Sequence, residues 1–377
     1  MRKKELKIAF VRRGYSASGG AEAYLKRLAR GLVAQGIYPR LITTRDWPDA
    51  EWQFGKLERT RARDPLGFAD EIERMHVRRK RMVIFSLERV WSCNIFRVGD
   101  GVHAAWLARK AKTQGALSRF AQKFTRKHDN ILQLEQSMLR QGRAELVIAN
   151  SDFVRDEIVN QYGFPAERIR IVRNGVRIAD FVLDLSRREE MRRDLGFSPE
   201  EIMVLFVGSG WERKGLRFAI NAVESLHDPR FRLVVAGRGA ARKYASRSAQ
   251  FVGESRDVRS LYGAADILLA PTLYDPFSNA CLEALAAGLP VITTRDNGFS
   301  EIIGNEINGT IVQHGSDVPA LSLALQFWAN AEKRELARKT NVELAARYDI
   351  SQNVEQTLAL IVQAASAAST SAKMRKT

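Results

Sequence analysis

Short apolar runs alternate with segments of helical periodicity along almost the whole chain. The first run, Lys7–Val11, is followed by a glycine-containing loop and by a segment from about residue 21 to 35 whose apolar residues recur at helical spacing. Gly36 ends this segment, and a second apolar run follows at residues 40–44. Strand, helix and strand at this spacing predict a parallel sheet with right-handed crossover connections.

The second half of the chain repeats this alternation. Ile202–Val207 is apolar throughout, as expected for a strand that helices cover on both faces, and further runs follow at Phe231–Ala236 and residues 266–270. A chain of 377 residues is too long for one ordinary core and suits two domains. We therefore predict an α/β protein with two parallel-sheet domains. Residues 46–80 fit neither pattern and predict an irregular basic connection.

Composition excludes several classes of protein. A hydrophobic content of 45% with 27% charged residues is typical of a globular chain and not of a disordered one. Cys93 and Cys281 are the only cysteines and lie in apolar surroundings, so we expect no disulfide framework, no thiolate metal site and a reducing compartment. The N-terminus lacks the apolar core of a leader peptide, and no apolar run approaches the ~20 residues of a membrane span.

The positive charge is unevenly distributed. Residues 1–180 contain 36 Lys and Arg against 20 Asp and Glu, so they contribute +16 of the net charge of +17. A solvated basic surface is one explanation. We favour a surface for an anionic partner, such as a phosphorylated acceptor or an acidic bilayer.

A pair of carboxylates marks the stretch from Tyr274 to Thr294. Asp275 and Glu283 are eight positions apart, and the sequence predicts a helix that begins near Ser278 or Asn279. A ligand at that helix start meets backbone N–H groups, the positive end of the dipole and two acceptor-only carboxylates. Amides suit anions, and carboxylates suit sugar hydroxyls. The stretch therefore predicts a pocket for a nucleotide sugar; a capping acid with a buried structural acid is the alternative.

Two cations precede this stretch. Gly208 and Gly210 form a loop after a predicted strand, and Arg213 and Lys214 are expected at the start of the next helix. A helix N-terminus with two cations is suited to a diphosphate, although solvated surface cations would give the same sequence.

Polar residues also follow the predicted strand at residues 93–98. Asp100 and His103 are placed at its carboxyl end, where ligands of open α/β sheets bind. A helix-capping or turn residue and a hydrogen-bonded surface histidine are the alternatives.

A basic segment with interleaved aromatics follows, at residues 106–143. Phe120 and Phe124 share a predicted helix face while the neighbouring cations fall elsewhere, which is typical of a basic amphipathic helix on a membrane surface. An ordinary surface helix with its aromatics in the core is the alternative. We see no nucleic-acid-binding signature and do not expect nucleic acid as a partner.

Together these motifs resemble one known family. Asp275-x7-Glu283, Arg213-Lys214-Gly215, Val235–Gly239 and Gly19-Gly20 make the chain similar to retaining GT-B glycosyltransferases of family 4, over residues 7–364. Gly99–His103 and the basic segment are most similar to bacterial lipopolysaccharide-core glucosyltransferases. The resemblance implies two Rossmann-like domains facing across a cleft, with the boundary between them near residues 177–187. Residues 1–180 would bind the acceptor, residues 181–364 would bind the nucleotide sugar and end in a helix that packs back on the first domain, and residues 365–377 would form a disordered tail.

The resemblance also implies roles for single residues. The catalytic residues would be Asp100, His103 and Asp275, and the donor would be bound by Gly19, Gly20, Arg213, Lys214, Gly239, Phe277, Ser278, Asn279 and Glu283. The membrane or acceptor surface would include Trp106, Arg109, Lys110, Arg119, Phe120, Lys123, Arg126 and Lys127. The family commonly has Glu in place of Asp275 and glycines in place of Pro276 and Ser278, which leaves the identity of the sugar open.

The function implied is transfer of a hexose, glucose-like, from a nucleotide diphosphate sugar that we expect to be UDP-linked. The acceptor would be a lipopolysaccharide core or related glycolipid at the cytoplasmic face of the membrane, where the protein would be peripheral. No metal or other cofactor is expected, because Arg and Lys can neutralise the diphosphate. Two alternatives stand beside this function: the same fold acting on a soluble sugar phosphate, and a non-enzymatic basic protein that binds anions.

Overall fold

The computed structural model describes residues 6–16, 20–78, 82–113, 126–182, 184–244, 246–255 and 257–374. The chain forms two compact units, each built on its own parallel sheet, which confirms the predicted fold class. Unit 1 contains the residues up to Val172 and from Gln352 onward, and unit 2 contains Arg173–Ser351. This division comes earlier than the residues 177–187 expected from sequence, and it assigns everything after Ser351 to unit 1.

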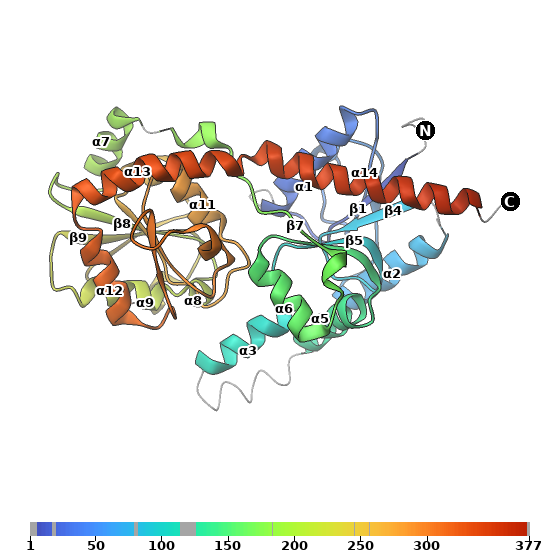
Figure 1. Cartoon of the computed structure of the whole chain (residues 1–377), viewed down its shortest axis with the longest axis horizontal. Coiled ribbons are helices and arrows are strands. Elements are labelled where there is room, and N and C mark those ends of the chain that lie inside the picture. The colour runs from blue at the N-terminus through green and yellow to red at the C-terminus, as the bar shows by residue number, and fades with distance from the viewer. Residues whose placement is uncertain are drawn as a thin grey trace. The chain divides into compact units, whose positions relative to one another are not determined.

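Unit 1 is a seven-stranded sheet in the order β3-β2-β1-β4-β5-β6-β7 (Figure 1). Its strands are β1 (Lys7–Val11), β2 (Arg40–Thr43), β3 (Leu57–Arg59), β4 (Met82–Ser86), β5 (Cys93–Val98), β6 (Ala144–Ala149) and β7 (Ile169–Ile171). Its helices are α1 (Gly20–Val33), α2 (Pro65–Arg78), α3 (His103–Thr113), α5 (Arg126–Glu135) with the π-helical turn η3 (Gln136–Arg140), α6 (Asp152–Tyr162) and α14 (Ile350–Met374). β4 is buried at all five positions, because helices cover both faces of the sheet.

Two segments of unit 1 differ from the sequence expectation. Residues 46–80 were expected to be irregular but contain β3 and the 14-residue helix α2. Pro65 suits the first position of this helix, and Phe68 and Ile72 bury one face of it, so tertiary packing determines the helix. The segment is also not basic, because its 8 Lys and Arg are balanced by 8 Asp and Glu. The expected tail at residues 365–377 is helical as far as Met374, consistent with its many alanines; residues 375–377 lie outside the described part.

Helix α14 is part of the unit 1 core. Leu358 and Ile361 are buried there, and Figure 1 shows α14 lying along α1. The contact is close because Gly31 of α1 has no side chain: a Cβ at this position would lie 2.4 Å from Leu358 Cδ1. The hydroxyls of Tyr24 and Thr357 are 2.8 Å apart, which adds a buried hydrogen bond between the two helices.

Unit 2 is a six-stranded sheet in the order β10-β9-β8-β11-β12-β13. Its strands are β8 (Ile202–Val207), β9 (Phe231–Ala236), β10 (Ala249–Gly253), β11 (Ile267–Ala270), β12 (Val291–Thr294) and β13 (Gly309–Val312). Its helices are α7 (Leu185–Asp194), α8 (Trp211–Lys214), α9 (Leu216–Glu224), α10 (Val258–Ala264), α11 (Asn279–Ala286), α12 (Val318–Phe327) and α13 (Ala331–Ala345). Separate apolar clusters cover the two faces of this sheet.

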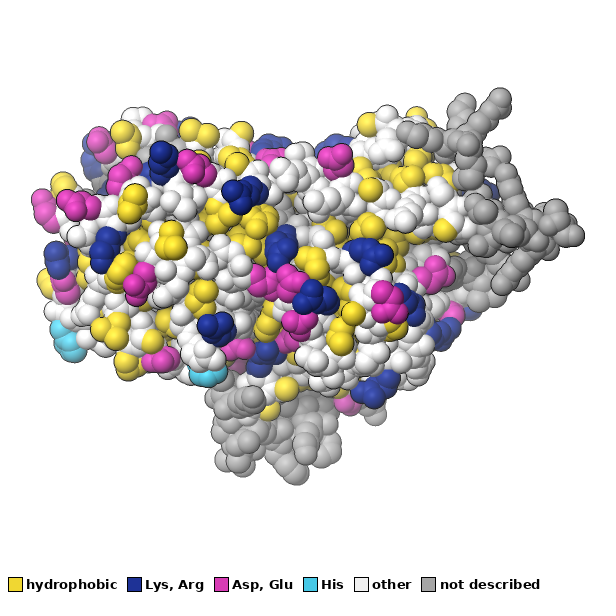
Figure 2. Space-filling view, viewed as in Figure 1, with side chains coloured by type: hydrophobic (Ala, Val, Ile, Leu, Met, Phe, Trp, Pro, Cys, Tyr) yellow, Lys and Arg dark blue, Asp and Glu magenta, His cyan; other side chains and the backbone are white. Residues whose placement is uncertain are grey.

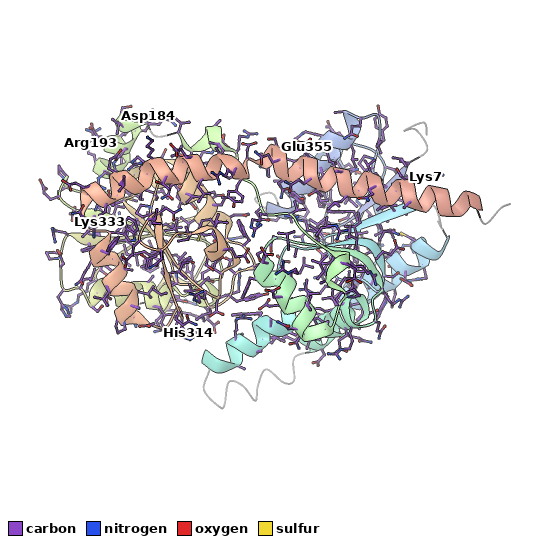
Figure 3. All side chains as sticks on the ribbon, viewed as in Figure 1. Lys7, Asp184, Arg193, His314, Lys333 and Glu355 are labelled. Carbon is purple, nitrogen blue, oxygen red and sulfur yellow. The ribbon has the colours of Figure 1, made fainter. Side chains whose placement is uncertain are left out.

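A buried ion-pair cluster fixes α7 to unit 2. Asp184, labelled in Figure 3, caps the helix, and its last turn carries Arg193. From the inner side of α7, Arg188 and Arg192 reach Asp266 at 2.6 and 2.9 Å. Asp266 also accepts a hydrogen bond from the Met203 N–H at 2.8 Å, so this carboxylate is fully engaged in joining α7 to the sheet.

Candidate functional site

The loop that leads into α11 positions the first carboxylate of the predicted pair. Asp275 is only 5% exposed, and its backbone N–H and C=O bond to Asp296 and Gly298, each at 2.9 Å. Ser278 then caps α11 by accepting a hydrogen bond from the Cys281 N–H, which confirms the predicted helix start. The Asp275 side chain is therefore held beside the N-terminus of a helix.

Asn297 joins this loop to α11 and β12, and sequence reasoning missed it. Its side chain is fully buried; Oδ1 accepts from the N–H groups of Ser278 at 3.3 Å and Phe299 at 3.1 Å. Nδ2 donates to Thr293 Oγ1 at 2.9 Å and to Cys281 Sγ at 3.5 Å. Ser278 was expected to bind the donor, but its N–H is bonded to Asn297 inside the protein and is not available to hold a sugar hydroxyl. An Asn after an apolar strand is the only signal in the sequence, and it equally predicts a turn.

Asn174 supports the same loop from the start of unit 2. Its amide nitrogen donates to the Phe277 carbonyl oxygen at 3.1 Å and to Asn279 Oδ1 at 2.8 Å. The Phe277 side chain is buried, whereas Asn279 is exposed. Two buried or half-buried asparagines thus fix the backbone of the predicted sugar-binding loop.

Arg213 and Lys214 lie at the end of a helix, and not at the start of one as predicted. Helix α8 is a single four-residue turn, and Gly215, with a φ of +78°, separates it from α9. Glycine is required at this position because a Cβ would lie only 2.0 Å from the Pro271 carbonyl oxygen. The break in the helix brings both cations next to the loop that follows β11.

The two cations make different contacts there. Arg213 Nη1 donates to the Tyr274 carbonyl oxygen at 2.8 Å and so holds the loop just before Asp275. The Lys214 ammonium forms an ion pair with the Asp275 carboxylate. The side chains of Lys214 and Asp275 are 16% and 7% exposed, respectively. The methylene groups of Lys214 lie beside Gly208.

The second carboxylate, Glu283, lies one turn inside α11 and is half-buried. Its Oε2 accepts a hydrogen bond from the Tyr262 hydroxyl at 2.9 Å. Burial raises the pKa of Glu283, against the opposing effects of this hydrogen bond and of the charges on Lys214 and Arg259. Among the residues described, Oε1 of Glu283 has no hydrogen-bond partner, so the carboxylate can accept hydrogen bonds from a ligand.

Gly239, predicted to contact the donor, lies in the loop after β9. A Cβ at Gly239 would lie 2.2 Å from the ring of Trp211, whose indole N–H donates to the Gly208 carbonyl oxygen at 2.9 Å. The need for glycine at this position is therefore explained by packing between the loops after β8 and β9.

In unit 1 the predicted residues Asp100 and His103 follow β5. Asp100 is exposed in the turn after the strand, and His103 is the first residue of α3. The His103 Nε2 lies 3.0 Å from Nδ1 of His128 in α5, and the two rings are 5.1 Å apart. The structure thus places His103 at a helix start, where its ring bonds to a second histidine that sequence reasoning did not select.

A fully buried glutamate caps α3 from the end of α5. Glu135 accepts hydrogen bonds from the N–H groups of His103 at 2.8 Å and Ala104 at 3.1 Å, from Arg89 Nε at 2.9 Å and from the Tyr162 hydroxyl at 2.7 Å. Burial alone would raise the pKa of Glu135, but the Arg89 charge and these hydrogen bonds hold it below its ordinary value. Glu135 therefore positions His103 through the backbone.

Arg12 organises the loop between β1 and α1. Its guanidinium donates to Glu22 at 3.1 and 3.2 Å and to Glu88 at 2.7 Å. Burial raises the pKa of Glu88, with opposition from the charge of Arg12. Of the predicted donor glycines in this region, Gly19 lies outside the described residues and Gly20 begins α1.

The predicted membrane surface is described only in part. Trp106, Arg109 and Lys110 lie in α3, the backbone of Arg126 and Lys127 begins α5, and Arg119, Phe120 and Lys123 lie outside the described residues. Arg109 pairs with Glu157 at 2.5 Å and lies over the Phe153 ring. On the face shown in Figure 2, described Lys and Arg side chains are interspersed with Asp and Glu and form no single patch.

The described part of the chain lacks both a membrane-spanning helix and a cluster of metal-binding side chains. Its helices do not combine the length and apolar character needed to cross a bilayer. It also contains no group of three or more His, Cys, Asp or Glu side chains arranged to hold a metal ion. Cys93 and Cys281 are both buried and carry free thiols.

Sequence comparison gives matches in both units. Residues 187–344 match the family described as glycosyl transferases group 1, and residues 18–180 match glycosyltransferase family 4. A probable transglycosylase of Burkholderia thailandensis is 30% identical over 365 residues, which cover 92% of this chain and 94% of that protein. The lipopolysaccharide glucosyltransferase WaaG of Escherichia coli K12 is 24% identical over 323 residues, which cover 81% of this chain and 84% of WaaG.

Solved structures share the fold over the whole length. A crystal structure of WaaG, a glycosyltransferase involved in lipopolysaccharide biosynthesis, matches with a TM-score of 0.78 and 22% identity, over 94% of this chain and 99% of that one. Anabaena HepE in complex with UDP-glucose matches with a TM-score of 0.71 and 17% identity, over 95% of this chain and 99% of that one.

Proposed function

We propose that this protein transfers a hexose with retention from a UDP-linked donor to a glycolipid. The premise is that the chain belongs to the group 1 and family 4 glycosyltransferases with the GT-B fold. The glucosyltransferase activity in the name of WaaG and the UDP-glucose bound to HepE support glucose and UDP as the first donor to test. The role of WaaG in lipopolysaccharide biosynthesis supports a lipopolysaccharide-core or related acceptor.

The observation that carries the proposal is the convergence of Lys214, Asp275 and Glu283 in unit 2. Lys214 contacts Asp275, and its charge acts on Glu283, although these residues come from two separate segments of the chain. Under the proposal, Lys214 binds the diphosphate, Asp275 accepts hydrogen bonds from sugar hydroxyls and Glu283 accepts them from the ribose. Arg213 adds positive charge while it holds the Tyr274 carbonyl oxygen.

The chemistry follows from these placements. Negative charge develops on the diphosphate as the glycosidic bond breaks, and Lys214 with Arg213 stabilises that charge. The acceptor hydroxyl attacks from the same face of an oxocarbenium-like sugar, and the departing phosphate takes its proton. Neither a covalent glycosyl-enzyme nor a hydrolase-type pair of carboxylates takes part. Neutralisation by two cationic side chains supports a reaction without a metal ion.

We place the acceptor on unit 1. Asp100 and His103 lie after β5, at the carboxyl end of the sheet where ligands of such folds bind, and Glu135 holds the backbone N–H of His103. The +16 charge of residues 1–180 supports an anionic acceptor or an acidic membrane surface, with the protein peripheral on the cytoplasmic side. The aromatic and basic side chains on α3, including Trp106 and Lys110, are part of the proposed contact surface.

A thermal-shift panel of nucleotide diphosphates and nucleotide sugars tests the donor site. A ligand at ~100 times its dissociation constant stabilises the folded state by ~2.7 kcal/mol, a readily measured shift. We expect a shift with UDP and UDP-glucose in the wild type, no shift in Glu283→Ala, and an unchanged shift in Glu343→Ala, which removes an exposed carboxylate of α13. A folded wild type that responds to no nucleotide contradicts the proposal.

The acceptor and the stereochemistry need separate measurements. Flotation with vesicles of neutral or anionic lipid tests the surface, and binding to anionic vesicles alone is expected. Nuclear magnetic resonance of the product made from UDP-glucose and a glycolipid acceptor should show an α-linked sugar. A β-linked product excludes retention, and efficient transfer to a soluble sugar phosphate without vesicle binding favours a soluble acceptor.

A further inference from the structure

The ion pair between Lys214 and Asp275 has an unusual feature. Among the residues described, neither the Lys214 ammonium nor the Asp275 carboxylate has any other hydrogen-bond or ion-pair partner. Both side chains are largely buried, with 16% and 7% of their surface exposed. Each group therefore depends on the other for its counter-charge as long as the site holds no ligand.

The proposed function assigns these two groups to different parts of the donor. Lys214 meets the diphosphate, whereas Asp275 meets the hydroxyls of the sugar. A ligand with a diphosphate and no sugar thus competes for Lys214 and offers Asp275 nothing in return. A buried carboxylate that loses its counter-ion is strongly disfavoured, because the low-dielectric surroundings do not replace the lost interaction.

We propose that the Lys214–Asp275 ion pair makes nucleotide binding depend on the sugar, so that the nucleoside diphosphate product binds more weakly than the intact donor and is released. This inference rests on the proposed function and deepens it. When the donor binds, the sugar hydroxyls donate to Asp275 as Lys214 turns to the diphosphate. After transfer the sugar has left, Asp275 regains Lys214, and the diphosphate loses its cation.

The surroundings of the pair favour this exchange. The charge of Lys214 also acts on the carboxylate of Glu283. When Lys214 moves away from Asp275, its ammonium therefore still has a second carboxylate nearby. The backbone of Asp275 is fixed by Asp296 and Gly298, so this carboxylate cannot follow Lys214 toward a ligand. The side chain of an aspartate has only one methylene group, so its carboxylate has a short reach when the backbone is fixed.

The test measures dissociation constants for UDP and UDP-glucose by calorimetry. Asp275→Asn keeps the shape of the side chain but removes the charge that competes for Lys214. We expect UDP to bind about tenfold more tightly than in the wild type, equivalent to ~1.4 kcal/mol, while UDP-glucose binds no more tightly. The preference for the intact donor should therefore fall by about tenfold or more.

Two further variants separate the ion pair from a general charge effect. In a Lys214→Gln background, Asp275→Asn should no longer tighten UDP binding, because no ammonium remains to be released. Glu212→Gln removes an exposed carboxylate of the same short helix and should leave the preference for UDP-glucose over UDP within twofold of the wild type.

The outcomes distinguish this inference from the proposed function. Wild type that binds neither UDP nor UDP-glucose overturns both. Wild type that binds UDP-glucose, with an Asp275→Asn variant whose UDP affinity is unchanged or reduced, overturns the inference and leaves the proposed function intact. Equal tightening of UDP in Asp275→Asn and Glu212→Gln also overturns it, because the effect is then one of net charge.

Discussion

Asn297 offers a direct test of how the loop between β11 and α11, residues 271–278, is held; we call this segment the donor loop. Asn297→Ala removes the Oδ1 atom that accepts hydrogen bonds from the Ser278 and Phe299 N–H groups. It also removes the Nδ2 donor to Thr293 and Cys281. The residue is fully buried, so water does not replace these partners without rearrangement of the loop.

The magnitude follows from the two N–H donors that lose their acceptor. Each buried donor left without a partner costs about 1–3 kcal/mol, so we expect Asn297→Ala to lower the free energy of unfolding by about 2–6 kcal/mol. This is a large fraction of the ~5–15 kcal/mol of a typical domain. The loop carrying Asp275 and Ser278 also loses its anchor, and we expect UDP-glucose to bind at least about tenfold more weakly, or ~1.4 kcal/mol.

The assay combines urea unfolding with calorimetric titration of UDP-glucose at a temperature where the variants remain folded. Asn341→Ala is the matched control. Asn341 is equally buried, but it donates to the carbonyl oxygens of Leu289 and Asn308, away from the donor loop. It should lose stability and keep its donor affinity within twofold. The reasoning is refuted if Asn297→Ala loses less than about 0.5 kcal/mol, or if both variants bind UDP-glucose equally.

Three further variants test other parts of the structure. Glu283→Gln should weaken UDP-glucose binding and yet raise the unfolding temperature at pH 7.5. The raised pKa of Glu283 means that the folded state binds more protons than the unfolded state, so ionisation of Glu283 lowers stability as pH rises. An unchanged unfolding temperature contradicts this. Glu135→Gln should lose about 3–5 kcal/mol at pH 7 by leaving Arg89 without its counter-ion. Because the pKa of Glu135 is lowered, its contribution is present above the ordinary value and disappears on acidification, so the two urea midpoints should converge at low pH. Gly215→Ala should destabilise more than Gly253→Ala, because both have φ near +70° to +80° but only the first Cβ meets a carbonyl oxygen; equal losses exclude the steric argument.

Features with short-range causes were predictable from sequence. The strands are apolar runs, and the start of α11 depends on the local cap at Ser278, so both could be located without knowledge of the tertiary structure. Asp275 and Glu283 could be selected because carboxylates on both sides of a helix start can accept hydrogen bonds from a ligand, and their role in donor binding stays a prediction. The position of Lys214 was misjudged because Gly215 ends α8, and the reason for that glycine is a contact with Pro271, 56 positions later in the chain.

Features with long-range causes were not predictable in the same way. Glu135 reads as an ordinary acid near the end of a helix, yet its partners come from α3, α6 and the loop before β5. Asn297 reads as a turn residue, yet its side chain bonds to Ser278 and Cys281 at the start of α11 and to Thr293 in β12. Helix α2 was missed although its sequence is not basic, because the burial of Phe68 and Ile72 that fixes it depends on the rest of unit 1. In each case the deciding contact joins segments whose proximity only the folded sheet establishes.

The distribution of charge predicts that donor binding and attraction to an anionic membrane depend on different cations. Three cations near the proposed sites are matched by neighbouring carboxylates: Lys214 by Asp275, Arg12 by Glu22 and Glu88, and Arg89 by Glu135. Arg12 and Arg89 are within residues 1–180, so the +16 excess of that segment belongs to other Lys and Arg side chains. The field of charges in water is screened beyond about 10 Å at 0.1 M salt. Raising the salt from 0.05 to 0.3 M should therefore release the protein from anionic vesicles while changing the UDP-glucose affinity far less. Equal sensitivity in co-sedimentation and calorimetry would mean that the same cations serve both ligands.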